Sequence, residues 1–277
     1  MIPRPRFLDE LILRINSDIS VRNRCLGDCG LLLTAGRAAG LSVNCISTAL
    51  ISYHCYNGAF QDPQKDTRWV VAAAIMLAWK VWEDHDDMKS VRKYPDIIKT
   101  VYRVIADDLH QDTPGINSIG EWLDNTKGDE MRWLKHQIRV YEKYILHSQL
   151  FVVPPDALLG PLRKSSSEGE TRTLPEAYIR LWGLTAIAAS DDIPQNLKSE
   201  LTAELLEAAI DCSLDFLRTP MSLLYPPYVL AICCLWKSAL HLNLDGAVDY
   251  LENLESYFNK EITDQISKSI FECLDHI

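Results

Sequence analysis

The chain has 277 residues, 47% of them hydrophobic and 24% charged, which is enough apolar sequence to bury the cores of two domains. Its formal net charge of −10 opposes sequence-independent binding to nucleic acid and binding to an anionic membrane. We therefore do not expect direct nucleic-acid binding. The longest apolar run, residues 69–79, is about half of what a bilayer requires, so we do not expect a membrane span.

Apolar residues recur at helical spacing and strand-like alternation is almost absent, which predicts an all-α fold. Gly40 is placed to end one helix and Ser42 to cap the next, which Asn57 and Gly58 should terminate. A short amphipathic helix is expected at residues 7–16, within an N-terminal lead-in of residues 1–21. The first half then continues with helices at residues 22–39, 43–56, 67–82, 94–106 and 129–147.

A break at Val153, Pro154 and Pro155 marks the predicted domain boundary. It divides the chain into domains of residues 22–152 and 153–277. The second domain is expected to hold helices at residues 175–189, 197–217, 226–241, 245–258 and 261–276.

One apolar helix recurs about half the chain later. Residues 71–80 (VAAAIMLAWK) align without a gap to residues 228–237 (YVLAICCLWK), with four identities at an offset of 157 positions. Both segments end in Trp-Lys. The repeat indicates one helical domain used twice.

Eight cysteines are present without any C-x-x-C pair, and several fall within apolar helical runs. There, free cysteine packs as a small hydrophobe. We therefore expect a reducing, intracellular location, with no disulfide framework, no cofactor and no metal.

Three segments resemble the cyclin family, over about residues 20–275. Residues 75–83 (IMLAWKVWE) are similar to the cyclin-box segment L-A-x-K-x-E-E, and Glu142 lies nine residues before Phe151, as in the E-x8-F spacing. Residues 217–231 (LRTPMSLLYPPYVLA) resemble the R-T-x-x-x-L-L-Y-P-P-x-x-I-A stretch of transcription-type cyclins. The resemblance implies two tandem five-helix cyclin boxes after a short N-terminal helix, the first box binding a kinase.

The resemblance also implies a function. The chain would be a nuclear regulatory subunit, with no catalytic residues of its own, that forms a heterodimer with a cyclin-dependent protein kinase and activates it in transcription, the cell cycle or meiosis. Lys80 and Glu142 would grip the kinase backbone near its αC helix from an exposed position, since an ammonium offers three donors and a carboxylate two acceptor oxygens. Trp79, Trp82 and Tyr141 would add contacts around them. The alternative is that Lys80 only covers the edge of the core and Glu142 belongs to a solvated helix face.

One departure from the family concerns substrate docking. Cys29 stands where the docking patch of cell-cycle cyclins has a tryptophan, so docking of R-x-L peptides is not expected.

Two other classes of function remain open. One is a kinase-independent scaffold in transcription, cell division or meiotic recombination, which would have the cyclin fold without binding a kinase. More remotely, the acidic cluster of residues 83–87 (Glu83 to Asp87) would serve an all-α metal-dependent enzyme, because a hard cation takes several carboxylate oxygens. His85 and Asp86 with His54 likewise resemble the H…HD set of metal phosphohydrolases. A solvated helix end explains the cluster without chemistry.

Overall fold

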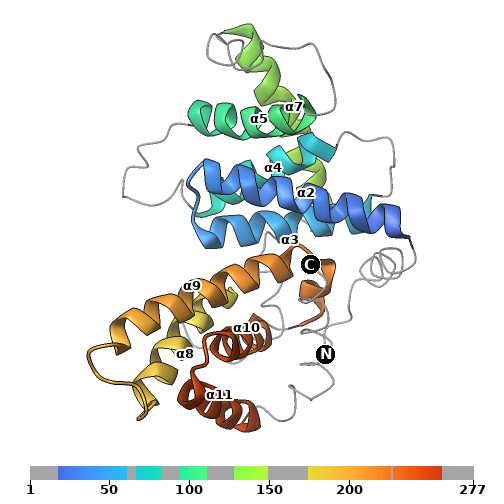
Figure 1. The fold of residues 1–277 in the computed structure, drawn as a ribbon. Coiled ribbons are helices and arrows are strands. Elements are labelled where there is room, and N and C mark those ends of the chain that lie inside the picture. Colours follow the sequence, from blue (N-terminus) through green and yellow to red (C-terminus); the bar gives the residue numbers. More distant parts are fainter. Residues whose placement is uncertain are drawn as a thin grey trace, which may run out of the picture. The chain divides into compact units, whose positions relative to one another are not determined.

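A computed structural model describes residues 18–60, 67–82, 94–110, 128–148, 174–225 and 227–257 (Figure 1). Every regular element within these ranges is a helix, which confirms the all-α class. In chain order they are α2 (Ile19–Ala38), α3 (Val43–Ala59), α4 (Thr67–Trp82), α5 (Tyr94–His110), α7 (Asp129–Ser148), α8 (Pro175–Ala189), α9 (Lys198–Leu217), the 3-10 helix η2 (Pro220–Leu224), α10 (Pro227–His241) and α11 (Asp245–Tyr257). The helices predicted at residues 7–16 and 261–276 lie outside the described residues.

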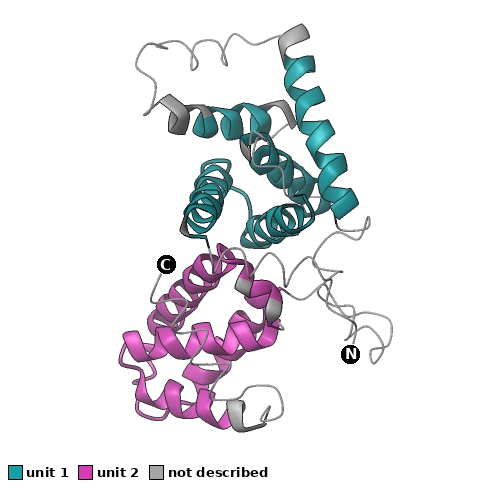
Figure 2. Ribbon diagram, turned by 90° about the vertical axis from the view of Figure 1, so that its right-hand side faces the viewer, with its two compact units in different colours: residues 1–157 teal, residues 158–277 magenta. Residues whose placement is uncertain are grey.

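The chain forms two compact units, Met1–Ala157 and Leu158–Ile277 (Figure 2). The sequence places the boundary at residue 153, within a stretch, residues 149–173, that is not among those described. None of the helices in the described ranges is both long and apolar enough to cross a membrane.

Helix α4 is the centre of the first unit and packs against α2, α3, α5 and α7. Ten consecutive residues, from Val70 to Trp79, are each at most 7% exposed. A helix that is apolar on all sides must be covered on all sides, and four neighbours do this. Burial of each large aliphatic side chain contributes roughly 1.5–3 kcal/mol, so the buried residues of α4 stabilise this unit.

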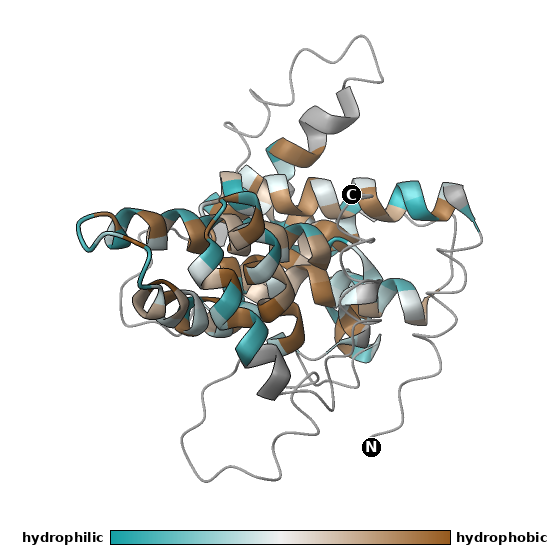
Figure 3. Cartoon of the chain, turned by 60° about the horizontal axis from the view of Figure 1, so that its bottom comes forward, coloured by the Kyte–Doolittle hydropathy of each residue, from teal (hydrophilic) through white to brown (hydrophobic). Residues whose placement is uncertain are grey.

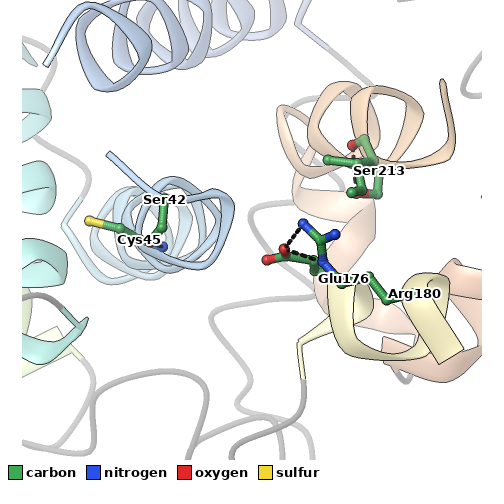
Figure 4. A network of polar contacts seen from close by, with 6 residues as sticks. Ser42, Cys45, Glu176, Arg180 and Ser213 are labelled. Carbon is green, nitrogen blue, oxygen red and sulfur yellow. Dashed lines mark hydrogen bonds and ion pairs between the residues drawn. The ribbon is translucent and has the colours of Figure 1, made fainter. Parts of the chain in front are cut away.

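The junction of α2 and α3 follows the predicted capping residues. Gly40 has a φ of +61°, and the amides of Gly40 and Leu41 donate to the carbonyl oxygens of Arg37 and Gly36, which is the Schellman pattern. The side-chain oxygen of Ser42 accepts from the amide of Cys45 at 3.3 Å and so caps α3 (Figure 4). Both predictions are confirmed, and they fix where α2 turns back as α3.

Two helices end three or more residues later than the sequence predicts. Helix α3 continues through Asn57 and Gly58 to Ala59, so the expected break there is wrong. Its last turn is held by packing: the ring of Phe60 lies 5.1 Å from that of Tyr56 and 5.7 Å from that of Tyr144. Helix α5 runs to residue 110 rather than 106. In α3, tertiary contacts therefore outweigh the low helix propensity of an Asn-Gly pair.

In the second unit, α10 packs against α8, α9 and α11. Pro227 is its first residue, where proline is tolerated because the first-turn amides lack intrahelical partners. The first turn of α8 carries an ion pair in which Arg180 lies 2.7 Å from the carboxylate of Glu176 (Figure 4). Most of the helices carry both hydrophobic and hydrophilic residues along their length (Figure 3).

The two units repeat one set of helix contacts. In the first unit α2 packs against α3, α4 and α5, while α4 also packs against α3 and α5. In the second unit α8 packs against α9, α10 and α11, while α10 also packs against α9 and α11. The central helices α4 and α10 are the two whose sequences align. The internal repeat in the sequence is therefore matched by a repeated arrangement of four helices.

Candidate functional site

Lys80 and Glu142 form an ion pair at the C-terminal end of α4. The Nζ atom of Lys80 lies 2.6 Å from Oε1 and 2.7 Å from Oε2 of Glu142, and the two residues are 62 positions apart in the chain. Lys80 is the basic residue of the last turn of α4, where a positive charge is favoured by the helix dipole. Packing of α7 along α4 brings the glutamate to it.

The burial of this pair differs from the expectation. The side chain of Lys80 is 34% exposed, but that of Glu142 is only 9% exposed. Glu142 is therefore not on a solvated helix face, and the expectation that both residues lie exposed is wrong for it. The reason is that Glu142 occupies a position of α7 close to its buried row, between Ile138 and Ile145. The ammonium is the part of the pair that solvent or a partner can reach.

The three predicted aromatic residues occupy different environments. Trp79 is 5% exposed and belongs to the core of the first unit. Trp82 and Tyr141 are half-buried. The indole nitrogen of Trp82 donates to the hydroxyl of Thr48 at 2.7 Å, which ties the end of α4 to α3. Trp82 and Tyr141 are thus the two aromatic side chains from the predicted set that remain partly accessible.

Several residues of the other predictions lie outside the described ranges. These are Phe151 and the whole acidic cluster of residues 83–87, with His85 and Asp86 in it. The metal-enzyme alternatives therefore keep only His54 among the described residues, and it is fully buried in α3.

His54 belongs to a buried group that the sequence analysis did not identify. Cys25 and Cys29, one turn apart on α2, face it from the neighbouring helix. The Sγ atom of Cys25 lies 3.8 Å from Nδ1 of His54, and that of Cys29 lies 3.8 Å from Nε2. The three residues are 5%, 0% and 0% exposed, in chain order. Of the described His, Cys, Asp and Glu residues, these three form the one group with metal-ligand spacing.

Electrostatics in this group lower the pKa of the Cys25 thiol. A hydrogen bond from the thiol of Cys29 is the largest influence and holds the pKa of Cys25 well below its usual range, against the effect of burial. His54 and Arg24 lower it further. Tyr53, beside the group, behaves oppositely: burial, and then the carboxylate of Asp28 to which its hydroxyl donates, raise its pKa well above the usual value.

The amino-acid sequence reveals only part of the Cys25–Cys29–His54 group. The spacing of Cys25 and Cys29 puts both thiols on one helix face, which is visible in the sequence. Their meeting with His54 depends on how α2 crosses α3, which no local pattern specifies. A search for C-x-x-C pairs does not find such a group.

Comparison with known proteins adds no assignment, since no family model matches the chain and no curated protein matches it in sequence.

Proposed function

We propose that the chain is a cyclin-like regulatory subunit that binds and activates a cyclin-dependent protein kinase through its first unit. The observation that carries this proposal is the Lys80–Glu142 pair at the end of the central helix α4. In the cyclin resemblance, these are the two residues that bind the kinase backbone. Their placement on α4 and α7 makes one site from two distant segments.

Two further features support the proposal. The repeated packing of four helices around α4 and around α10 is what a protein built from two tandem boxes requires. Trp82 and Tyr141, both half-buried, provide partly accessible aromatic area near the pair, and aromatic residues are enriched at protein interfaces.

The geometry gives each member of the pair a separate role. An ammonium has three N–H donors, so Lys80 can hold the glutamate and also donate to a main-chain carbonyl of a partner. Glu142, largely buried, orients the ammonium and keeps it extended rather than folded back on the surface. The pair is therefore preorganised, which reduces the entropy lost on binding.

Activation would follow by population shift. A kinase that is mostly inactive alone becomes active if the partner binds its active arrangement more tightly, and the position of the αC helix is part of that arrangement. The chain supplies no catalytic group in this mechanism.

The test is the affinity for purified cyclin-dependent kinases of Lys80→Ala and of a matched control, Lys237→Ala. Lys237 ends the aligned segment of the second unit, on α10, at the position equivalent to Lys80. We expect Lys80→Ala to weaken kinase binding by about 30-fold or more, since it leaves kinase groups buried and unpaired, at about 2–4 kcal/mol. Lys237→Ala should change it by less than about twofold, because Lys237 is a half-buried residue of the second unit and has no place in the proposed kinase site.

Glu142→Ala and the double variant complete the cycle. Because Glu142 acts by orienting Lys80, the double change should cost less kinase affinity than the sum of the single changes. Kinase activity towards a peptide should rise on adding the wild-type chain. An unchanged kinase affinity of Lys80→Ala, together with lower thermal stability, would make the pair a purely structural salt bridge and favour the kinase-independent scaffold.

A further inference from the structure

We propose that Cys25, Cys29 and His54 form a zinc site that joins α2 to α3 inside the first unit. The three donor atoms lie within 4.8 Å of one another and come from two helices. Two cysteines and one histidine are a ligand set that Zn²⁺ uses in proteins. This inference is independent of the proposed kinase binding.

The distances are close to those of a tetrahedral ion. With Zn–S and Zn–N bonds of about 2.3 and 2.0–2.1 Å, sulfur and nitrogen ligands stand about 3.6 Å apart and two sulfurs about 3.8 Å. The closest sulfur–nitrogen distances here are 3.8 Å, from Cys25 to Nδ1 and from Cys29 to Nε2 of His54. One ion would bind only one of these nitrogens, and with one donor atom from each residue all separations are at most 4.8 Å. Side-chain rotations that shorten the remaining separations by up to about 1 Å would bring all three donors onto one ion.

The charge of the group suits Zn²⁺. Two thiolates and a neutral imidazole around a divalent cation sum to zero, and a neutral group is the least costly to keep in a dry interior. A monovalent soft cation such as Cu⁺ would leave a net charge of −1 among buried residues. Cys25, 5% exposed, is the least buried of the three residues.

A disulfide is the main alternative use of two neighbouring cysteines, and helix geometry disfavours it. Residues four apart on a helix have Cβ atoms about 5–6 Å apart, whereas a disulfide needs about 3.5–4.5 Å. Cys25 and Cys29 lie within the unbroken helix α2. Metal binding joins them without bending the helix, and the imidazole from α3 completes the set.

The site would stabilise the first unit. Zinc that binds the folded chain and not the unfolded one raises stability in proportion to the logarithm of its concentration above Kd. At about 100 times Kd the thermal midpoint of the first unit should rise by about 5–10 °C, and a chelator should reverse the rise.

The test uses the full chain, reduced and stripped of metal with a chelator. Zn²⁺ titrated against a chromophoric competitor should bind with one equivalent at micromolar Kd or tighter. Co²⁺ should give the intense near-ultraviolet absorption of thiolate-to-cobalt charge transfer and the visible bands of a tetrahedral site. Cys25→Ser and Cys29→Ser, nearly equal in shape to the wild type, should each weaken Zn²⁺ binding at least about 100-fold, more than loss of an outer-shell group does.

The matched control is Cys234→Ser, on α10. Cys234 is also buried and hydrogen-bonded to a second thiol, that of Cys212, but belongs to no such group with an imidazole among the described residues. It should leave Zn²⁺ affinity and the cobalt spectrum unchanged. Circular dichroism of each variant checks that it is folded.

Four results would overturn the proposal. They are no binding of Zn²⁺ by the folded, reduced wild type; a Zn²⁺ affinity of Cys25→Ser or Cys29→Ser equal to that of the wild type; displacement of Zn²⁺ by excess Mg²⁺, which would place the ion on carboxylates; and binding of Cu⁺ alone. None of these results bears on kinase affinity, so the two proposals fail separately.

Discussion

Two glycines of α2 have different surroundings, and the same substitution should have opposite effects at the two positions. A Cβ atom added at Gly27 meets nothing within 4 Å. One added at Gly36 lies 2.8 Å from Cγ1 and 3.3 Å from Cδ1 of Ile46, on α3. Carbon atoms in contact are about 3.5–4.0 Å apart, so Gly36→Ala forces a shift where α2 and α3 pack.

The magnitudes follow from two terms. Alanine is more favourable than glycine inside a helix by about 0.8–1.0 kcal/mol, so Gly27→Ala should raise the free energy of unfolding by about that amount. At Gly36 the same gain is opposed by overpacking, at about 1–3 kcal/mol. Ile46 is 3% exposed and β-branched, which leaves it little rotational freedom to relieve the contact. The expected net effect of Gly36→Ala is a loss of about 1 kcal/mol.

Thermal unfolding followed by circular dichroism, in chelator to remove any metal effect, measures both variants. At about 2–4 °C per kcal/mol, the midpoint of the first unit should rise by roughly 3 °C for Gly27→Ala and fall by roughly 3 °C for Gly36→Ala. In an Ile46→Ala background, which removes the crowded atoms, Gly36→Ala should become neutral or stabilising. If Gly36→Ala is as stable as Gly27→Ala in the wild-type background, the packing of α2 on α3 described here is wrong.

Two further predictions concern the ion pair and Tyr53. Lys80→Ala should lower the free energy of unfolding by about 2 kcal/mol, because it leaves the carboxylate of Glu142, whose side chain is only 9% exposed, without its partner. Glu142→Ala should lower it by about 1 kcal/mol, because the side chain of Lys80 is 34% exposed and water can solvate it. Chemical denaturation that gives the reverse order would contradict this. Tyr53→Phe should cost about 1 kcal/mol at neutral pH, since it removes the hydrogen bond to Asp28. The pKa of Tyr53 is raised by folding, so its stabilising contribution is complete below the pKa of the unfolded chain, about 10, and is lost as the pH rises above it. The gap between wild type and variant should therefore narrow above about pH 10, and a constant gap would refute the raised pKa.

Most helix ends could be predicted because local residues determine them. The start of α3 depends on the side chain of Ser42, and the end of α2 depends on the positive φ that Gly40 allows. Helix α3 extends through Gly58 for a different reason, the packing of Phe60 on the rings of Tyr56 and Tyr144. The contact between Phe60 and Tyr144 joins residues far apart in the chain, so no local pattern contains it.

The candidate sites likewise depend partly on local sequence and partly on contacts between helices. The resemblance to a family selected Lys80 and Glu142, but the burial of Glu142 came from the packing of α7 on α4. The sequence contains part of this signal, because Ile138 and Ile145, four residues before and three residues after Glu142, place it beside the apolar face of the helix. Cys25 and Cys29 show their common helix face in the sequence, whereas their approach to His54 requires the crossing of α2 and α3.

Comparison of the two units shows which features of the first unit are not needed for its helix arrangement. Helices α8 to α11 repeat the packing of α2 to α5, and the described part of that unit contains no group of cysteine and histidine with metal-ligand spacing. The shared arrangement therefore forms without an imidazole between two thiols. It also forms without a described counterpart of α7, the helix that carries Glu142. Since helix packing alone demands neither the Cys25–Cys29–His54 group nor the Lys80–Glu142 pair, each needs a reason specific to the first unit. Zinc binding and kinase binding are the two reasons we propose, and substitutions that separate stability from metal affinity and from kinase affinity distinguish them.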